Sequence, residues 1–313
     1  MKVVNFELTI DPSSVKEKIV SKITDTMQKK ETEGCLVIFS GQNDSFAAAN
    51  LTIKAAGIEA VKLVIISDVP KERREQIASI AKTELKIPQN KIFSFNIKGI
   101  YKKFESIEEL APITGIPVSR QQNISHLLLR TKLVQKIVEE KTFSHIGKTY
   151  GSRDKFFREL IAYSKAKKRL KTILAYLIAE KENLLLVSKT NKTEYKTGLY
   201  TIFGYGHAAD IMPLGDLYRT QVLQLSEYFG VPQEIRDHAH SDIMPGVVNK
   251  YQYFFELDSN IVDKILIRLE TEIEVYNIAE ELNIKIEKVD RVKHFFNVSK
   301  LQEVLPIIPY INK

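Results

Sequence analysis

An apolar run near the start of the chain ends abruptly in small and polar residues, with the sequence Leu-Val-Ile-Phe-Ser-Gly-Gln-Asn-Asp-Ser over residues 36–45. The residues that follow have the composition of a helix. A buried strand that turns tightly into a helix collects unpaired backbone N–H groups and the positive end of the helix dipole. Ser40 and Ser45 would add hydroxyl groups there, and Asp44 a carboxylate. The pattern is typical of a loop that binds phosphate, although Ser40 and Asp44 also suit a plain turn and helix start.

Strands and helices alternate over the first hundred residues. Apolar strands are predicted over residues 36–39, 61–67 and 92–97, with helices over 15–27, 45–56 and 71–85. Continuous apolar strands separated by helices indicate a parallel sheet with helices on both faces. In such sheets ligands bind beyond the carboxyl ends of the strands, where residues 40–45 fall.

The pattern changes between residues 100 and 160, which are charged and lack strand signals. We interpret this stretch as a helical insertion or cap within one domain over residues 1–313. A helix over 165–179 and a fourth strand over 184–188 resume the alternation, and the chain from Leu214 onward is predicted to be helical. The fold class is therefore α/β, with a helical insertion and a helical C-terminal part.

Composition limits the classes of function. The 313 residues carry a formal net charge of +7, which fits anionic ligands such as nucleotides or nucleic acid. No stretch approaches the ~20 apolar residues of a membrane span, and the N-terminus lacks a hydrophobic signal region, so we expect a cytoplasmic protein. Cys35 is the only cysteine and is expected to be a buried structural thiol.

Several downstream motifs keep the same order and spacing as those of one known family. They are Asn-Lys-Thr-Glu at 191–194, Gly-Leu-Tyr-Thr at 198–201, the run at 204–222, Phe-Gly-Val-Pro at 229–232, Pro-Gly at 245–246, and Asp263, Leu266, Asn297 and Lys300. The loop over 40–45 resembles the Ser-Gly-Gly-x-Asp-Ser loop of ATP pyrophosphatases. Together these segments resemble the ammonia-dependent NAD synthetases, over most of the chain except about 100–160.

The resemblance implies an adenine-nucleotide α-hydrolase-like fold and an amide ligase that uses ATP and Mg²⁺. A carboxylate of deamido-NAD would attack the α-phosphorus of ATP, and ammonia would then displace AMP from the acyl-adenylate. The implied ATP-binding residues are Ser40, Gly41, Gln42, Asp44, Ser45, Arg169 and Lys189. The implied substrate-binding residues are Tyr205, His207, Asp210 and Arg219, and the implied magnesium ligands are Asp44 and Glu194. No residue is assigned as catalytic.

Some residues, including several of these, depart from the family pattern at positions that carry chemistry. Gln42 replaces a glycine, and Ile202 and Tyr205 replace a lysine and an aspartate. Lys250 ends a segment that in the family reads Gln-Thr-Asp-Glu, and Lys189 stands at a threonine. An alternative hypothesis is therefore a diverged relative that adenylates another acid, or a nucleotide-binding pseudoenzyme that acts with a partner.

The resemblance also implies partners. We expect a homodimer, small-molecule nucleotide substrates, and nitrogen from free ammonia or a separate ammonia-supplying subunit, with an intact paralogue as a further candidate partner. Nucleic-acid binding is the third hypothesis, based on the net charge, the basic residues 165–171 and a helix-turn-helix-like rhythm over 278–292. We rank it last, because such a turn is common in helical proteins.

Overall fold

The computed structural model describes residues 6–106, 155–236 and 249–300. Its first part contains α1 (Pro12–Lys30), β1 (Gly34–Ile38), α2 (Asn43–Ala56), β2 (Val61–Ser67), α3 (Lys71–Leu85), β3 (Ile92–Asn96) and α4 (Lys98–Glu105). After residue 154 come α7 (Lys155–Lys181), β4 (Leu184–Val187), α8 (Lys192–Thr197), α9 (Arg219–Tyr228) and α10 (Gln233–Arg236). The final part contains α11 (Lys250–Phe255), α12 (Ser259–Glu270), α13 (Val275–Glu281) and α14 (Ile286–Lys300).

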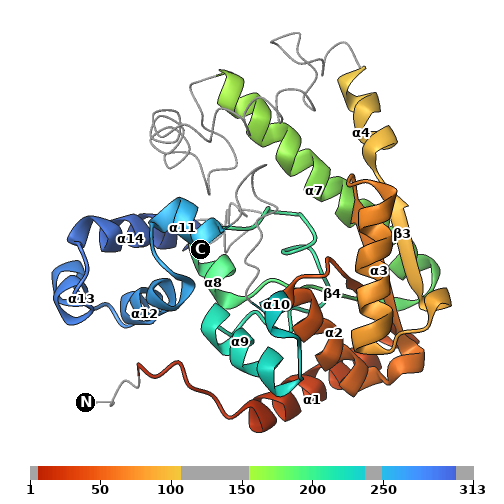
Figure 1. Ribbon diagram of the computed structural model, residues 1–313, viewed down its shortest axis with the longest axis horizontal. Helices are drawn as coiled ribbons and strands as arrows, with labels where there is room; N and C mark the ends of the chain where they lie inside the picture. The colour runs from red at the N-terminus through yellow and green to blue at the C-terminus, as the bar shows by residue number, and fades with distance from the viewer. Residues whose placement is uncertain (1–5, 107–154, 237–248, 301–313) are drawn as a thin grey trace, which may run out of the picture.

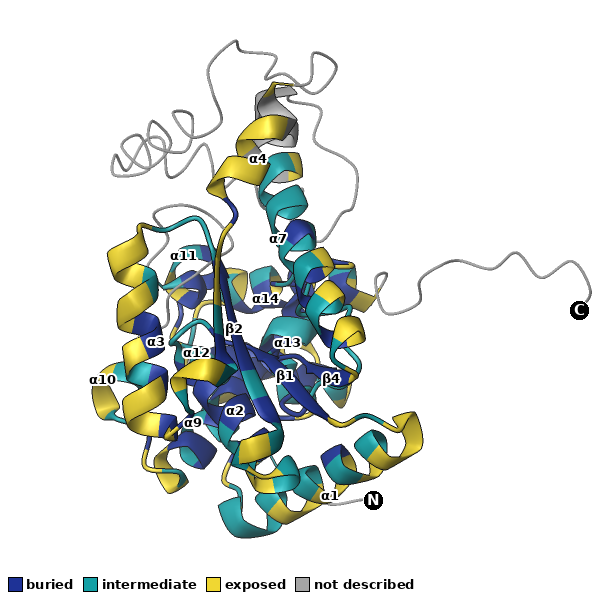
Figure 2. Cartoon of the chain, turned by 90° about the vertical axis from the view of Figure 1, so that its right-hand side faces the viewer, coloured by how far each residue is buried: buried dark blue, intermediate teal, exposed yellow. Residues whose placement is uncertain are grey.

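The four strands form one parallel sheet in the order β3-β2-β1-β4. β1 therefore lies inside the sheet, with Leu36 opposite Lys62 of β2 and Leu186 of β4. All five residues of β1 are buried, in keeping with the dark blue strands of Figure 2. Since parallel strands end at a common edge, the chain leaves β1 at the edge where β4 also ends.

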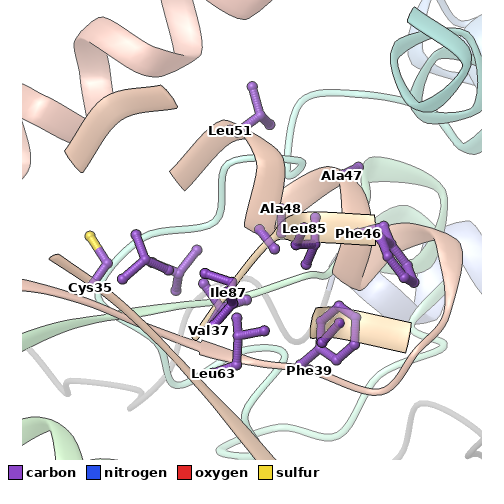
Figure 3. Packing of buried hydrophobic residues seen from close by; sticks show 14 of the residues in the cluster. Cys35, Val37, Phe39, Phe46, Ala47, Ala48, Leu51, Leu63, Leu85 and Ile87 are labelled. Carbon is purple, nitrogen blue, oxygen red and sulfur yellow. The ribbon is translucent and has the colours of Figure 1, made fainter. Parts of the chain in front are cut away.

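Alternate residues of β1 pack into different cores. Cys35 and Val37 join the core formed with α1, α2, α3 and α9, whereas Leu36 and Ile38 join the core formed with α7. Figure 3 shows the first core, in which the rings of Phe39 and Phe46 meet edge to face with centroids 4.9 Å apart. This alternation is the physical reason for the uninterrupted apolar run, because both faces of the strand are covered.

Cys35 lies in this core as a structural thiol, as predicted. Its side chain is fully buried, and burial raises the pKa of the thiol to about 12. The Sγ atom lies 3.4 Å from the sulfur of Met27. Because the thiolate is the reactive form, this environment keeps Cys35 inert.

The C-terminal helices α11 to α14 enclose a separate core beside the sheet domain (Figure 1). Phe254, Phe255 and Phe295 pack together there, with centroids of Phe255 and Phe295 5.0 Å apart. The helix-turn-helix-like rhythm over 278–292 corresponds to α13 and α14, whose apolar residues Ile278, Val289 and Val292 are all buried in this core. Core packing therefore accounts for that periodicity.

The sequence predictions for the strands and helices are confirmed, and apart from the start of α7 their ends match or shift by one to three residues. β1 begins at Gly34, where a Cβ atom would lie 2.2 Å from the carbonyl oxygen of Ala60. The helix predicted over 165–179 is longer and begins at Lys155. Most of the predicted insertion lies outside the described residues. Within the described parts of the chain, no helix combines the length and apolar character that crossing a bilayer requires.

Candidate functional site

The loop between β1 and α2 is closed by its own side chains. Gly41 has φ +73°, a left-handed conformation that glycine adopts at little cost. The Ser45 hydroxyl is buried, accepts hydrogen bonds from the N–H groups of Ser40 (3.3 Å) and Gln42 (3.2 Å), and donates to the Gln42 carbonyl (2.7 Å). Ser45, predicted to bind phosphate, therefore fixes the loop from within.

Lys189 reaches this loop from the end of β4. Its ammonium donates to the Ser40 hydroxyl at 2.7 Å and to the side-chain carbonyl of Gln42 at 3.2 Å. Gln42 has φ −99°, so its backbone does not require the glycine found in the family pattern. Its amide instead lies against the Lys189 ammonium, which brings a positive charge to the N-terminus of α2.

Asp44, in the first turn of α2, forms a buried ion pair with Arg219 of α9. The Asn191 side chain donates to the other oxygen of Asp44 at 3.3 Å. Burial opposes ionisation of Asp44, but the positive charges of Arg219, Lys250 and Lys189 outweigh it and lower the pKa of the carboxyl. Asp44 is therefore an anion whose charge is already neutralised by the protein.

Glu194 forms a second ion pair with Lys250. Asn191 caps α8 by accepting the Glu194 N–H at 2.9 Å, and the Glu194 carboxylate accepts the Asn191 N–H at 3.2 Å. Asn249 caps α11 by accepting the N–H of Tyr251 at 3.0 Å, which places Lys250 in the first turn of that helix. Two capped helices thus hold the pair in position.

A buried carboxylate, Asp263, joins the elements that carry these ion pairs. It accepts the Thr193 hydroxyl at 2.5 Å and both the N–H (2.8 Å) and hydroxyl (2.7 Å) of Thr220. Burial raises the pKa of Asp263 to about 6, against the opposing effect of these hydrogen bonds. The Thr193 hydroxyl also accepts the Arg219 N–H at 2.8 Å, so α8, α9 and α12 are tied together at the site.

The residues present do not form a ready magnesium site. Oxygen ligands suit that ion, and Asp44 and Glu194 are the carboxylates predicted to bind it. Each of them is paired with a buried cation, Arg219 or Lys250. Among the described residues, no three His, Cys, Asp or Glu side chains cluster as a metal-binding set. A divalent ion bound by these carboxylates would have to displace the side chains of Arg219 and Lys250.

Other predicted site residues lie among different neighbours. The Arg169 guanidinium donates to the carbonyl of Ile202 at 3.1 Å, and the Tyr205 ring packs beside the α7 core. The His207 ring stacks on Tyr200 with centroids 5.6 Å apart, and burial lowers the pKa of His207. None of these contacts reaches the loop at residues 40–45.

Asp210 has a role at the outer edge of the sheet. Its carboxylate accepts the Leu186 N–H at 2.8 Å and forms an ion pair with Lys30. Its own N–H donates to the Leu186 carbonyl at 3.0 Å. Because β4 is an edge strand, these bonds satisfy backbone groups that would otherwise lack a strand partner.

Sequence reasoning did not assign Lys250 or Tyr251 to the site. In the sequence, Lys250 stands out only as a departure from the family pattern. The Tyr251 side chain is buried, and none of the described residues gives its hydroxyl a hydrogen bond. Burial and the charge of Glu194 raise the pKa of Tyr251 well above its usual value. The only available signal was a lysine at an acidic position, which a single sequence cannot connect to Glu194.

Comparison with known proteins identifies related chains. The sequence profile of the NAD synthase family matches residues 113–306. The NH(3)-dependent NAD(+) synthetase of Thermotoga neapolitana is 28% identical over 286 residues, which cover 90% of this chain and 92% of that protein.

Solved structures share the fold at lower identity. The NMN synthetase of Francisella tularensis aligns with a TM-score of 0.66 at 18% identity, covering 96% of this chain and 99% of that one. The NH3-dependent NAD synthetase of Campylobacter jejuni aligns with a TM-score of 0.64 at 17% identity, covering 96% of this chain and all of that one. These likenesses confirm the α/β fold.

Proposed function

This chain belongs to the NAD synthase family, and on that basis we propose that it is an ammonia-dependent ligase that converts deamido-NAD, ATP and ammonia into NAD, AMP and pyrophosphate. The observation that carries the proposal is the convergence of Lys189, Arg219 and Lys250 around the N-terminus of α2. A helix N-terminus surrounded by cations is suited to the triphosphate of ATP.

In the first step a carboxylate oxygen of deamido-NAD attacks the α-phosphorus of ATP, and pyrophosphate leaves. Negative charge accumulates on the departing phosphates, so nearby cations stabilise the transition state. We assign this role to Lys189, whose ammonium is held by Ser40 and Gln42. The N–H groups of Asn43 and Asp44, in the first turn of α2, have no intrahelical acceptors and supply further donors.

In the second step ammonia attacks the carbonyl carbon of the acyl-adenylate, AMP leaves, and a proton is released. Substrate binding by Tyr205, His207 and Asp210, and nucleotide binding by Arg169, remain part of the proposal on the basis of the family resemblance. Mg²⁺ enters the proposal as the ion that accompanies ATP in solution and that its phosphates bind.

The test is a reaction of the purified protein with deamido-NAD, ammonium chloride and Mg-ATP. NAD and AMP are expected in equal amounts, and the absence of both products at high protein concentration would contradict the proposed activity. Lys189→Gln removes the charge at the loop and should lower kcat/KM, because it removes stabilisation of the leaving phosphates. Lys91→Gln is the matched control. Lys91 pairs with Glu59 at the amino ends of the strands, away from the loop, so this change should leave the rate unchanged.

A second candidate function is a nucleotide-binding protein without turnover. It is favoured by the pairing of both Asp44 and Glu194 with cations and by the amide of Gln42 beside Lys189. Calorimetric titration with ATP separates the two candidates. Binding of ATP without formation of NAD or AMP would support the second candidate, and Gln42→Gly would then show whether the amide limits turnover.

The proposal also includes a homodimer in the cytoplasm, supplied with free ammonia or by a separate subunit or paralogue. An exposed apolar strip on α7 supports the dimer, because Ile173 and Leu177 are 65% and 60% exposed and Phe203 lies beside them. Light scattering after gel filtration should give twice the mass of the 35.8 kDa chain. Ile173→Asp should reduce it to the mass of the monomer.

A further inference from the structure

The oxygens of Glu194 are both engaged by the protein itself. The Lys250 ammonium forms an ion pair with Oε1, and the Asn191 N–H donates to Oε2 at 3.2 Å. The Lys250 side chain is only 8% exposed. A divalent cation at Glu194 would therefore have to occupy the position of a buried ammonium.

Asp44 is engaged in the same way. Its Oδ1 accepts from Arg219 and its Oδ2 from Asn191, and the side-chain amide of Asn43 lies 3.4 Å from Oδ1. The Arg219 side chain is 6% exposed. Displacing such a cation from a buried pair leaves an uncompensated charge, which is strongly unfavourable.

The local structure holds the Lys250 ammonium in place. Asn249 caps α11 immediately before Lys250, and the Lys250 Nζ lies 5.2 Å from the centroid of the Tyr251 ring. Cation–π attraction therefore adds to the ion pair with Glu194. The positive charge of Lys250 also acts on Asp44, so one ammonium serves both carboxylates.

We propose that Lys250 supplies the positive charge beside Glu194 that a protein-bound divalent cation would otherwise provide, so that this site binds the triphosphate of ATP without a resident metal ion. The inference rests on the proposed function in one respect, because it takes ATP as the ligand. Any Mg²⁺ that reaches the site would be carried by the phosphates of the nucleotide.

The first experiment is a titration of the nucleotide-free protein with Mn²⁺, followed by electron paramagnetic resonance. The parent protein should leave the signal of free Mn²⁺ unchanged. Lys250→Gln frees the Glu194 carboxylate and should create Mn²⁺ binding, which the further change Glu194→Gln should abolish. Mn²⁺ binding by the parent that is lost in Glu194→Gln would overturn the inference.

The second experiment measures ATP affinity by calorimetry in Mg²⁺ and in EDTA. The parent should bind ATP in EDTA at least as tightly as in Mg²⁺, because metal-free ATP carries more negative charge. Lys250→Gln should weaken binding in EDTA and make it depend on Mg²⁺, whereas Lys250→Arg should retain the behaviour of the parent. Parent binding that requires Mg²⁺, or a Lys250→Gln variant that matches the parent, would contradict the inference.

Lys91→Gln is the control for loss of a lysine charge away from the site, and circular dichroism of each variant reports folding. The proposed function and the role of Lys250 are tested by different measurements. Absence of ATP binding in every condition would contradict the proposed function, whereas the Mn²⁺ titration contains no nucleotide and decides the role of Lys250 by itself.

Discussion

The ion pairs at the amino ends of the strands, here called the amino edge of the sheet, differ in burial from those at the carboxyl ends, the carboxyl edge. At the amino edge, Lys62 pairs with Glu182, and Lys91 pairs with Glu59. The side chains of Lys62 and Glu182 are each 29% exposed, and Glu59 is 81% exposed. Water and salt screen such pairs, so they contribute little to stability.

At the carboxyl edge, the pairs Asp44–Arg219 and Glu194–Lys250 are buried. Removing these charges from water costs more than their mutual attraction returns unless other hydrogen bonds complete the geometry. Asn191 provides such bonds to both carboxylates. The buried pairs place charge where the chain leaves β1, whereas the pairs at the amino edge are partly exposed to water.

The largest effect is expected from breaking one buried pair. Arg219→Met leaves Asp44 without its main counter-charge and should lower the free energy of unfolding by about 3 to 5 kcal/mol. Urea denaturation measures this loss. The double variant Asp44→Asn with Arg219→Met removes both charges and should recover much of the lost free energy of unfolding. Equal losses in the single and double variants would contradict the claim that the unpaired charge of Asp44 causes the loss.

The buried carboxylate of Asp263 predicts a dependence on pH. Its pKa is about 6 in the folded protein and 3.8 in the absence of burial, so the folded state holds a proton that the unfolded state loses. The free energy of unfolding should therefore fall by about 3 kcal/mol as pH rises from about 4 to above 6. This contribution is fully present below the unfolded pKa and lost above the folded one.

Asp263→Asn should remove that part of the pH dependence, as measured by urea denaturation across the pH range. Asp290→Asn, at an exposed position on α14, is the matched control and should retain it. An Asp263→Asn variant with the same slope as the parent would show that Asp263 is already ionised at low pH.

A smaller effect is expected at the turn that forms the loop. Gly41→Ala forces a side chain into a left-handed conformation and should lower the free energy of unfolding by about 1 to 2 kcal/mol. Gly230→Ala, at φ +72° with no atoms near the added Cβ, should lose a similar amount. Only Gly41→Ala should also weaken ATP binding, as measured by calorimetry. Equal ATP affinities of the two variants would contradict the proposal that this loop binds the nucleotide.

The smallest effect is expected at the amino edge. Lys62→Gln should change the free energy of unfolding by less than about 1 kcal/mol, because the pair with Glu182 is partly exposed. The small loss should disappear at high salt. A loss of unfolding free energy as large as that of Arg219→Met would contradict the distinction between the buried pairs at one edge and the partly exposed pairs at the other.

The sequence by itself determined the sheet and the turn that follows β1. The apolar runs of β1, β2 and β4 match buried strands, because only strands covered on both faces lack a polar alternation. The Ser-Gly start of the loop likewise predicted a turn at Gly41, whose positive φ favours glycine. These are local properties, which neighbouring residues decide.

Only the tertiary structure decided which charges meet at the site. Arg219 reaches Asp44 across 175 positions of the chain, and Lys250 reaches Glu194 across 56. The sequence could mark each residue as charged, but the pairing depends on how α8, α9 and α11 pack around the end of the sheet. The charge of Arg219 beside Asp44 then lowers the pKa of that carboxyl, because the energy of a charge depends on its surroundings and not on its neighbours in sequence.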